Sequence, residues 1–480
     1  MDKKKLFMIG GVAAVVVVIV LCLVCCGGKK EQYCSAIPKD AVAVWRVDGK
    51  SFLDKHDIDL SPLMSLMTGS EDGELKVGID FCKPIYGFVQ ENGTFGVVAK
   101  VSDAEALSSL IGTTANSKTK EKQGYNWFEM SDIVVAYDNE RLLALSRAGM
   151  NTRKLMLSLL EQDVDESILS TERYDNLIGA KKPVALIMSP SKVKSLGMAM
   201  AMSGTSAKAM DYDVLMTLDT EKQNAVLAAD YIANTDEAKE QIEKASTFLS
   251  KIDGKYISSV CENPFMWAAA NVPGDKIAEI VKQSGIAGLL EGPAAAILDV
   301  VTKLSGDITF CMPSLDADKP SFMLMAETNN IDIDKLVGLF DMKGEAEDEM
   351  QLSSAIQTLK VGPDAYCISN GNTPFFLGLK DKNLYLASST ELSDKVGQEF
   401  DSNIEELKDE ITDSYFYFTV DLAPVKTMMM QASELRAYAA LFANRIAKLD
   451  RLTMVINEPT HFELRLSVKD GEDFVKAMFK

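Results

Sequence analysis

The sequence predicts an α+β fold of two tandem, internally duplicated halves, each a mostly antiparallel sheet with helices packed on one face. Three observations predict it: short strands joined by tight turns, acidic helix starts that follow strands, and the same succession of elements met twice along the chain. The 480 residues are 47% hydrophobic and 25% charged, which is typical of globular domains.

A strand that leads into a polar corner and an acidic helix start occurs four times. The copies lie at 95–107, 226–238, 322–336 and 462–474. Free backbone N–H groups at a helix start attract carboxylates, so acidic residues at these corners, such as Asp103, suit helix capping. We therefore interpret them as caps and not as catalytic groups.

Two predicted hairpins and a repeated strand-to-helix unit complete the pattern. Segments 133–146 and 375–388 each hold two apolar strands separated by a turn of Asp, Asn and Lys residues. A strand that opens into a helix is expected at 41–52, 183–194, 265–277 and 415–426. In chain order these elements predict a first half at 36–250 and a second at 263–480, each within the size range of one domain.

The N-terminal residues predict that the protein is attached to a membrane. Basic residues at 3–5 precede an uncharged run at 6–24, and the run ends at Leu23-Val24-Cys25-Cys26. Cys26 best fits the lipidated cysteine of a bacterial lipoprotein, which makes 1–25 a signal peptide and 26–35 a tether. Gly27 follows, where an Asp would favour inner-membrane retention, so we expect the outer membrane, with the periplasmic or surface face open. The alternative is an uncleaved membrane-spanning helix.

Charge and composition exclude several classes of function. A formal charge of −20 disfavours nucleic-acid binding, and only two histidines, His56 and His461, disfavour His-based zinc sites and catalytic triads. No nucleophile elbow, phosphate loop or zinc helix occurs. We therefore predict no enzyme, no metal site and no cofactor.

The cysteines after the signal are few and odd in number. They are Cys34, Cys82, Cys261, Cys311 and Cys367. Such a set does not predict a disulfide framework. One bridge is possible, but we expect these residues to act mainly as small buried hydrophobes.

Methionines recur at matching places in the two halves, and they form the candidate binding site. Met198 and Met202 would share one face of a helix, and Met428 and Met429 stand at the corresponding place in the second half. Adaptable core packing is the preferred interpretation. An apolar or peptide-binding groove is the functional alternative, and a Cu(I) site is a remote third.

The residues at 23–26 and the strand entry Ile37-Pro38-Lys39-Asp40-Ala41, with the duplicated order, resemble an uncharacterised family of Bacteroidetes envelope lipoproteins. That family is a domain of unknown function. The resemblance implies location and architecture, and no activity or functional residues.

Together these features predict a membrane-anchored envelope lipoprotein that binds or scaffolds. Its expected partners are the membrane, through the N-terminal lipid, and an envelope protein or an apolar ligand. One alternative is a carboxylate-dependent hydrolase acting on glycans, which predicts two facing carboxylates with perturbed pKa values. Another is a carrier of lipid or apolar peptide.

Overall fold

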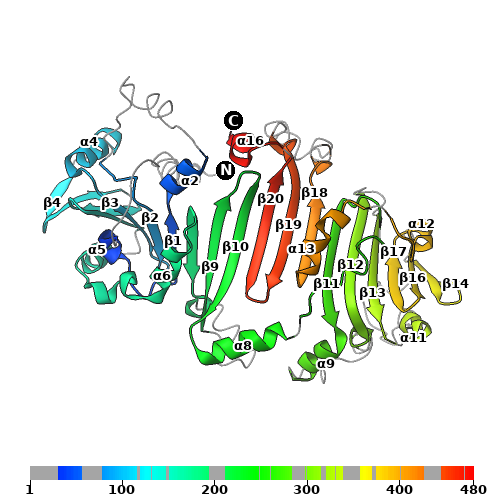
Figure 1. Cartoon of the computed structure of the whole chain (residues 1–480). Coiled ribbons are helices and arrows are strands. Elements are labelled where there is room, and N and C mark those ends of the chain that lie inside the picture. The colour runs from blue at the N-terminus through cyan, green and yellow to red at the C-terminus, as the bar shows by residue number, and fades with distance from the viewer. Residues whose placement is uncertain are drawn as a thin grey trace. The chain divides into compact units, whose positions relative to one another are not determined.

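The structure is a computed structural model that describes most of the chain from Glu31 onward (Figure 1). The described residues are 31–56, 78–115, 119–130, 132–146, 151–193, 211–247, 249–259, 261–283, 298, 300–314, 321–329, 331–338, 357–369, 374–400, 402–425, 427, 445–469 and 471–479. The chain forms two compact units, Met1–Lys239 and Glu240–Lys480. The boundaries predicted for the two halves, the signal peptide and the tether stay predictions.

The first unit contains ten strands and shorter helical elements among its described residues. Its strands are β1 (Ala43–Val47), β2 (Ile85–Val89), β3 (Phe95–Lys100), β4 (Lys120–Lys122), β5 (Tyr125–Glu129), β6 (Ile133–Tyr137), β7 (Arg141–Ser146), β8 (Val184–Met188), β9 (Tyr212–Thr220) and β10 (Asn224–Ala233). Its helices are η1 (Gln32–Ala36), α2 (Gly49–His56), α4 (Ala104–Ala115), α5 (Thr152–Leu160), η2 (Val164–Glu166), η3 (Ile168–Ser170), α6 (Glu172–Gly179) and η4 (Pro190–Lys192), and α8 (Asp236–Ser246) crosses the boundary between the units.

All strand pairs of the first unit are antiparallel among the described residues. They give the order β4-β5-β6-β7-β3-β2-β1-β8-β9-β10. Antiparallel strands can be joined by short turns, and these strands have the usual lengths, from 3 residues in β4 to 10 in β10.

Helices of the first unit contact both faces of its sheet. Leu143 packs with residues of η1, α5 and α6 in the main core. Its neighbour Leu142 packs with Leu107 of α4 in a second cluster. Neighbouring residues of a strand point to opposite faces, so α4 and α5 lie on opposite sides of the sheet (Figure 1). The mostly antiparallel α+β fold is confirmed, whereas helices on one face alone are not.

The second unit also contains ten strands in its described part. They are β11 (Met266–Pro273), β12 (Leu304–Ser314), β13 (Ser321–Thr328), β14 (Gln357–Gly362), β15 (Ala365–Ser369), β16 (Pro374–Lys380), β17 (Asn383–Ala387), β18 (Phe416–Asp421), β19 (Leu449–Glu458) and β20 (His461–Val468). Its helices are α9 (Gly274–Gln283), α11 (Ile333–Gly338), α12 (Thr390–Asp394), η6 (Glu405–Leu407), α13 (Lys408–Thr412) and α16 (Phe474–Phe479).

The strands of the second unit follow the order β14-β15-β16-β17-β13-β12-β11-β18-β19-β20, again antiparallel throughout the described part. Tyr385 belongs to a core cluster that includes residues of α12 and α13. The adjacent Leu384 belongs to a cluster with residues of α11. Helices therefore contact both faces of this sheet as well.

The predicted hairpins and caps are present. Segment 133–146 forms the β6–β7 hairpin, and segment 375–388 contains the β16–β17 hairpin. Asp381 and Lys382 between β16 and β17 both have positive φ, as a tight hairpin turn requires. Asp103 accepts hydrogen bonds from the backbone N–H groups of Glu105 and Ala106, both at 3.0 Å, so its carboxylate caps α4 as predicted.

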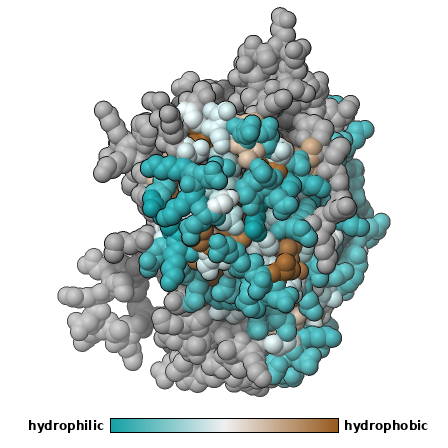
Figure 2. All heavy atoms as spheres, turned by 90° about the vertical axis from the view of Figure 1, so that its left-hand side faces the viewer, coloured by the Kyte–Doolittle hydropathy of each residue, from teal (hydrophilic) through white to brown (hydrophobic). Residues whose placement is uncertain are grey.

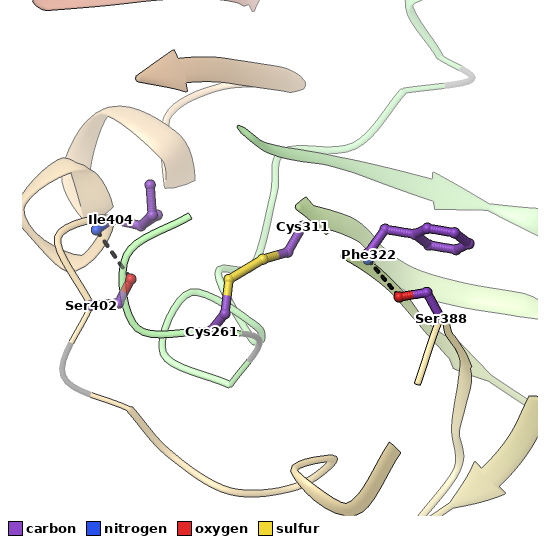
Figure 3. The surroundings of a disulfide bond; sticks show 6 residues. All are labelled: Cys261, Cys311, Phe322, Ser388, Ser402 and Ile404. Atoms are coloured by element: carbon purple, nitrogen blue, oxygen red, sulfur yellow. Dashed lines mark hydrogen bonds between the residues drawn. A yellow bond between two sulfur atoms is a disulfide. The ribbon is translucent and has the colours of Figure 1, made fainter. Parts of the chain in front are cut away.

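The expectation that the cysteines act mainly as buried hydrophobes is wrong for one pair. Cys261 and Cys311 form a disulfide (Figure 3). The spacing of cysteines does not reveal connectivity, and here the bond joins the segment that precedes β11 to β12. Cys34, a free and fully buried thiol, does follow the expectation.

The described residues on the side of the molecule where β4 lies are mainly hydrophilic (Figure 2). Apolar residues are visible there only as small separate patches between polar ones. This polar surface agrees with the acidic composition of the chain, whose formal charge is −20.

Candidate functional site

The site residues predicted from sequence lie outside the described residues. This holds for Cys26 and for the four methionines, Met198, Met202, Met428 and Met429. Their roles stay predictions. The described strands carry a different feature, which the strand register makes visible.

An apolar row crosses eight strands of the second sheet. Residues paired directly opposite one another in antiparallel strands share a face, so a chain of such pairs traces a line across that face. From β16 to β20 the row consists of Leu377, Leu386, Leu324, Phe310, Ala268, Phe418, Met454 and Leu464. At about 4.8 Å between strands, its seven intervals span about 34 Å.

A matching apolar row crosses eight strands of the first sheet. From β6 to β10 it consists of Val135, Ala144, Val97, Gly87, Trp45, Leu186, Met216 and Ala229. Each row starts beside a helix: Val135 and Ala144 pack against the α4 cluster, and Leu377 and Leu386 belong to the α11 cluster. The other members lie outside the packed clusters formed by the described residues.

The centres of the two rows are complementary. In the first unit, Trp45 of β1 lies against Gly87 of β2, and a Cβ atom on Gly87 would stand 2.0 Å from Cζ2 of the indole. In the second unit, the small residue is Ala268 of β11 and the aromatic ring belongs to Phe310 of β12. Strands β1 and β2 hold the same places in the first sheet as β11 and β12 in the second. The aromatic residue is on β1 in the first sheet and on β12 in the second, and its partner on the adjacent strand is small in both.

Most members of the rows remain partly accessible to solvent. Phe310, Phe418, Met454 and Leu464 are all half-buried. On the same face of the first sheet, Phe95 lies beside Trp45, with ring centroids 5.1 Å apart, and is 41% exposed. The row members are half-buried or buried, and Phe95 beside them is an exposed large apolar side chain on this face of the first sheet.

The sequence alone does not reveal the apolar rows. A signal exists in runs such as Phe416-Tyr-Phe-Thr-Val420, where residues on both faces of the strand are apolar. Such runs are typical of strands covered on both faces. The sequence alone could not join them into a line, because their neighbours come from distant segments.

The buried Asp307 and the exposed Asp253 beside it are the nearest match to the hydrolase alternative, and they serve structure. Asp307 of β12 accepts hydrogen bonds from the backbone N–H groups of Asp253, Gly254 and Lys255, at 2.9, 2.8 and 3.1 Å. Asn271 bridges the two carboxylates, donating to Asp253 at 3.1 Å and to Asp307 at 3.2 Å. Burial raises the pKa of Asp307, but the residue is only 1% exposed. It fastens the segment that leads to β11 and offers no access to a substrate.

The described residues contain neither a metal-binding cluster nor a membrane-spanning helix. No group of three or more His, Cys, Asp or Glu side chains in the described part could hold a metal ion. No helix in that part is long and apolar enough to cross a membrane.

The fold and the rows define a protein of two antiparallel-sheet units, each with an apolar row on one sheet face. The chain belongs to the DUF4836 family, a domain of unknown function whose sequence model matches residues 71–473. The predicted kinship with a domain of unknown function is thereby confirmed, and its lipoprotein character and source stay predictions. A search of curated proteins finds no match.

Solved structures of the protein TP0453 are similar to parts of this chain. Crystal form I has 10% identity and a TM-score of 0.26, covering 41% of this chain and 77% of that chain. Crystal form III has 11% identity and a TM-score of 0.26, covering 45% of this chain and 86% of that chain. Such low scores establish neither a shared fold nor a shared function. Neither the family nor these structures name an enzyme.

Proposed function

We propose that this protein is a lipid-anchored protein of the cell envelope that binds the acyl chain of a lipid along its apolar rows. The observation that carries the proposal is the unbroken line of apolar residues across eight strands of each sheet. A binding role agrees with the absence of catalytic motifs from the sequence.

The dimensions and chemistry of the rows suit an acyl chain. One leaflet of the hydrocarbon core is about 15 Å thick, so a lipid chain of that length fits within a row of about 34 Å. Each buried methylene contributes about 0.8 kcal/mol, so ten of them contribute about 8 kcal/mol before the cost of ordering the chain. Micromolar binding needs about 8 kcal/mol net, so a bound chain must bury more than about ten methylenes to offset the cost of ordering it.

The disulfide supports an extracytoplasmic location. Structural disulfides persist mainly in oxidising compartments, and Cys261–Cys311 is such a bond. Together with the basic and apolar segments that precede Cys26, it favours export and lipidation at that cysteine. The residue after Cys26 is Gly27, which favours the outer membrane.

We also propose that the two units arose by internal duplication. The support is the common strand order and the exchange of Trp45 and Gly87 for Ala268 and Phe310 at the same place in both sheets. The candidate methionines at 198, 202, 428 and 429 follow β8 and β18, which occupy equivalent positions in the two orders. They remain predicted contributors to the apolar site, because thioether side chains adapt to irregular apolar ligands.

The proposal is tested by native mass spectrometry of the protein extracted from its own membrane in mild detergent. We expect the mass of a chain that begins at Cys26 with its acyl groups, and an additional lipid mass that is lost on denaturation. A protein with the acyl groups but no additional lipid would contradict binding along the rows. A chain that keeps residues 1–25 would contradict the lipid anchor.

Two variants distinguish lipid binding along the rows from lipid binding to any exposed apolar residue. Phe418→Asp places a charge in the middle of the second row, and we expect it to reduce the retained lipid several-fold. Leu359→Asp is the matched control, because Leu359 of β14 is 66% exposed and belongs to neither row. Equal lipid retention by the two variants, with both folded by circular dichroism, would contradict the proposal.

A further inference from the structure

The first described residue, Glu31, is held by buried tyrosines of the first unit. Its carboxylate accepts hydrogen bonds from the hydroxyl groups of Tyr86 of β2 and of Tyr174 of α6, the latter at 3.3 Å. Burial raises the pKa of both tyrosine hydroxyls, so both stay protonated and can donate. Tyr33 donates to the carbonyl oxygen of Pro84 at 2.6 Å. The four side chains Glu31, Tyr33, Tyr86 and Tyr174 form what we call the clamp.

The short helix η1 after Glu31 is also held to the first unit, by burial and by hydrogen bonds. Cys34 is fully buried, and Ser35 is 7% exposed. Arg141 of β7 donates to Oγ of Ser35 at 2.8 Å, and Gln162 donates to the carbonyl oxygen of Ser35 at 2.6 Å. Detaching η1 from the unit would break these hydrogen bonds and expose its buried side chains. The segment before Glu31 is therefore not lengthened by local unfolding of η1.

The chain between the clamp and the predicted lipid is short. Glu31 follows Cys26 by five residues, and an extended chain spans at most about 3.5 Å per residue, which gives about 17 Å. The headgroup layer of one leaflet is itself about 5–8 Å thick. A point on the surface of the first unit is therefore kept close to the lipid headgroups.

We propose that the surface around the clamp is the membrane-proximal surface of this protein, and that its partner is the headgroup layer of the bilayer. The proposal rests on the lipidation of Cys26 proposed above. Its second element is the clamp, which fixes where the tether ends on the folded unit. Lys29 and Lys30 of the tether suit contact with anionic headgroups.

The clamp and the apolar row lie on opposite faces of the first sheet. Tyr86 pairs directly with Arg46, so the two residues share a face, and Trp45 next to Arg46 points to the other. The tether thus ends on the face that carries the main core, and the row occupies the face away from it. Attachment to the membrane does not by itself press the row against the bilayer.

Two labelled positions test the membrane-proximal surface. A fluorophore at Gln32, exposed beside the clamp, is compared with one at Glu121, exposed on β4. Helix η1 contacts β7 and β3, which lie three and four strand intervals from β4, or about 14–19 Å. The lipidated protein, with Cys82→Ser and Cys367→Ser, is placed in vesicles of phosphatidylethanolamine and phosphatidylglycerol that carry headgroup nitroxides. We expect several-fold stronger quenching at position 32.

A tether variant provides the control. Twenty Gly and Ser residues inserted after Lys30 add a mean reach of about 25 Å, which should lower quenching at position 32 to the level at position 121. Protein that floats with the vesicles but is quenched equally at both positions, or is unaffected by the insertion, would overturn the membrane-proximal surface alone. Protein that neither floats nor carries acyl mass would overturn the lipid anchor, and this inference with it.

Discussion

Removal of the Cys261–Cys311 disulfide should destabilise the second unit by about 4 kcal/mol. The two cysteines are 50 residues apart, and the chain-entropy relation for a loop of that length gives about 4 kcal/mol at 25 °C. Cys311 lies opposite Trp267 in the register of β11 and β12, inside the main core of the unit. The bond therefore joins the segment that precedes β11 to the centre of the sheet (Figure 3).

The assay is urea unfolding of the double variant Cys261→Ser/Cys311→Ser, followed by tryptophan fluorescence. Trp267 is 1% exposed and reports on the second unit, and Trp267→Phe identifies its share of the signal. Dithiothreitol should lower the midpoint of the wild type and leave that of the double variant unchanged. A loss of stability below about 1 kcal/mol would refute the reasoning, since the typical range is about 2–4 kcal/mol. So would an equal effect of dithiothreitol on both proteins.

Three further substitutions test the first unit by its unfolding free energy. Gly87→Phe should lower the unfolding free energy by about 1–3 kcal/mol, because the new phenylalanine ring meets the indole of Trp45. Adding Trp45→Ala should restore the stability by recreating the arrangement of the second unit. A double variant that is no more stable than Gly87→Phe would count against the duplication. Arg173→Met should cost about 3–5 kcal/mol, because Arg173 lies 3.5 Å from the buried Asp213; adding Asp213→Asn should recover part of the loss. Burial opposes ionisation of Asp219, but hydrogen bonds from two lysines outweigh it and lower its pKa, so Asp219→Asn should cost about 2 kcal/mol at neutral pH. This cost should shrink as the pH falls through the lowered pKa, below 3.8, and a constant cost would contradict the assignment.

Local features of the fold could be predicted because their physics lies within a few residues. The corner at Asp103 is a cap whose partners follow at Glu105 and Ala106, so sequence order alone places donor beside acceptor. The hairpin at 133–146 likewise joins adjacent strands through one turn. Element types and turn positions were accessible for this reason.

The apolar rows and the disulfide could not be predicted because both depend on contacts between segments that are distant in the sequence. Phe310 and Phe418 flank Ala268 from strands that are far apart in the sequence. A shift of one residue in either pairing would turn the aromatic ring to the other face of the sheet. Cys261 and Cys311 face the same difficulty, since spacing does not determine which cysteines pair. The sequence predicts methionines as site residues because thioethers are soft and occur at matching places, whereas the apolar rows consist of ordinary strand residues.

The apolar rows also explain why the strands carry more hydrophobic residues than a sheet with one core would need. A sheet with one wet face alternates polar and apolar residues, and a charged substitution on the wet face costs little. Here Leu143 and Ala144 of β7 point to opposite faces and both are apolar, as are Tyr417 and Phe418 of β18. The face that carries Leu143 in the first unit, or Tyr417 in the second, packs into the main core of its unit. The other face carries the apolar row of its unit, with α4 in the first unit and α11 in the second packed at one end of that row, and it is the face on which the proposed acyl chain would lie.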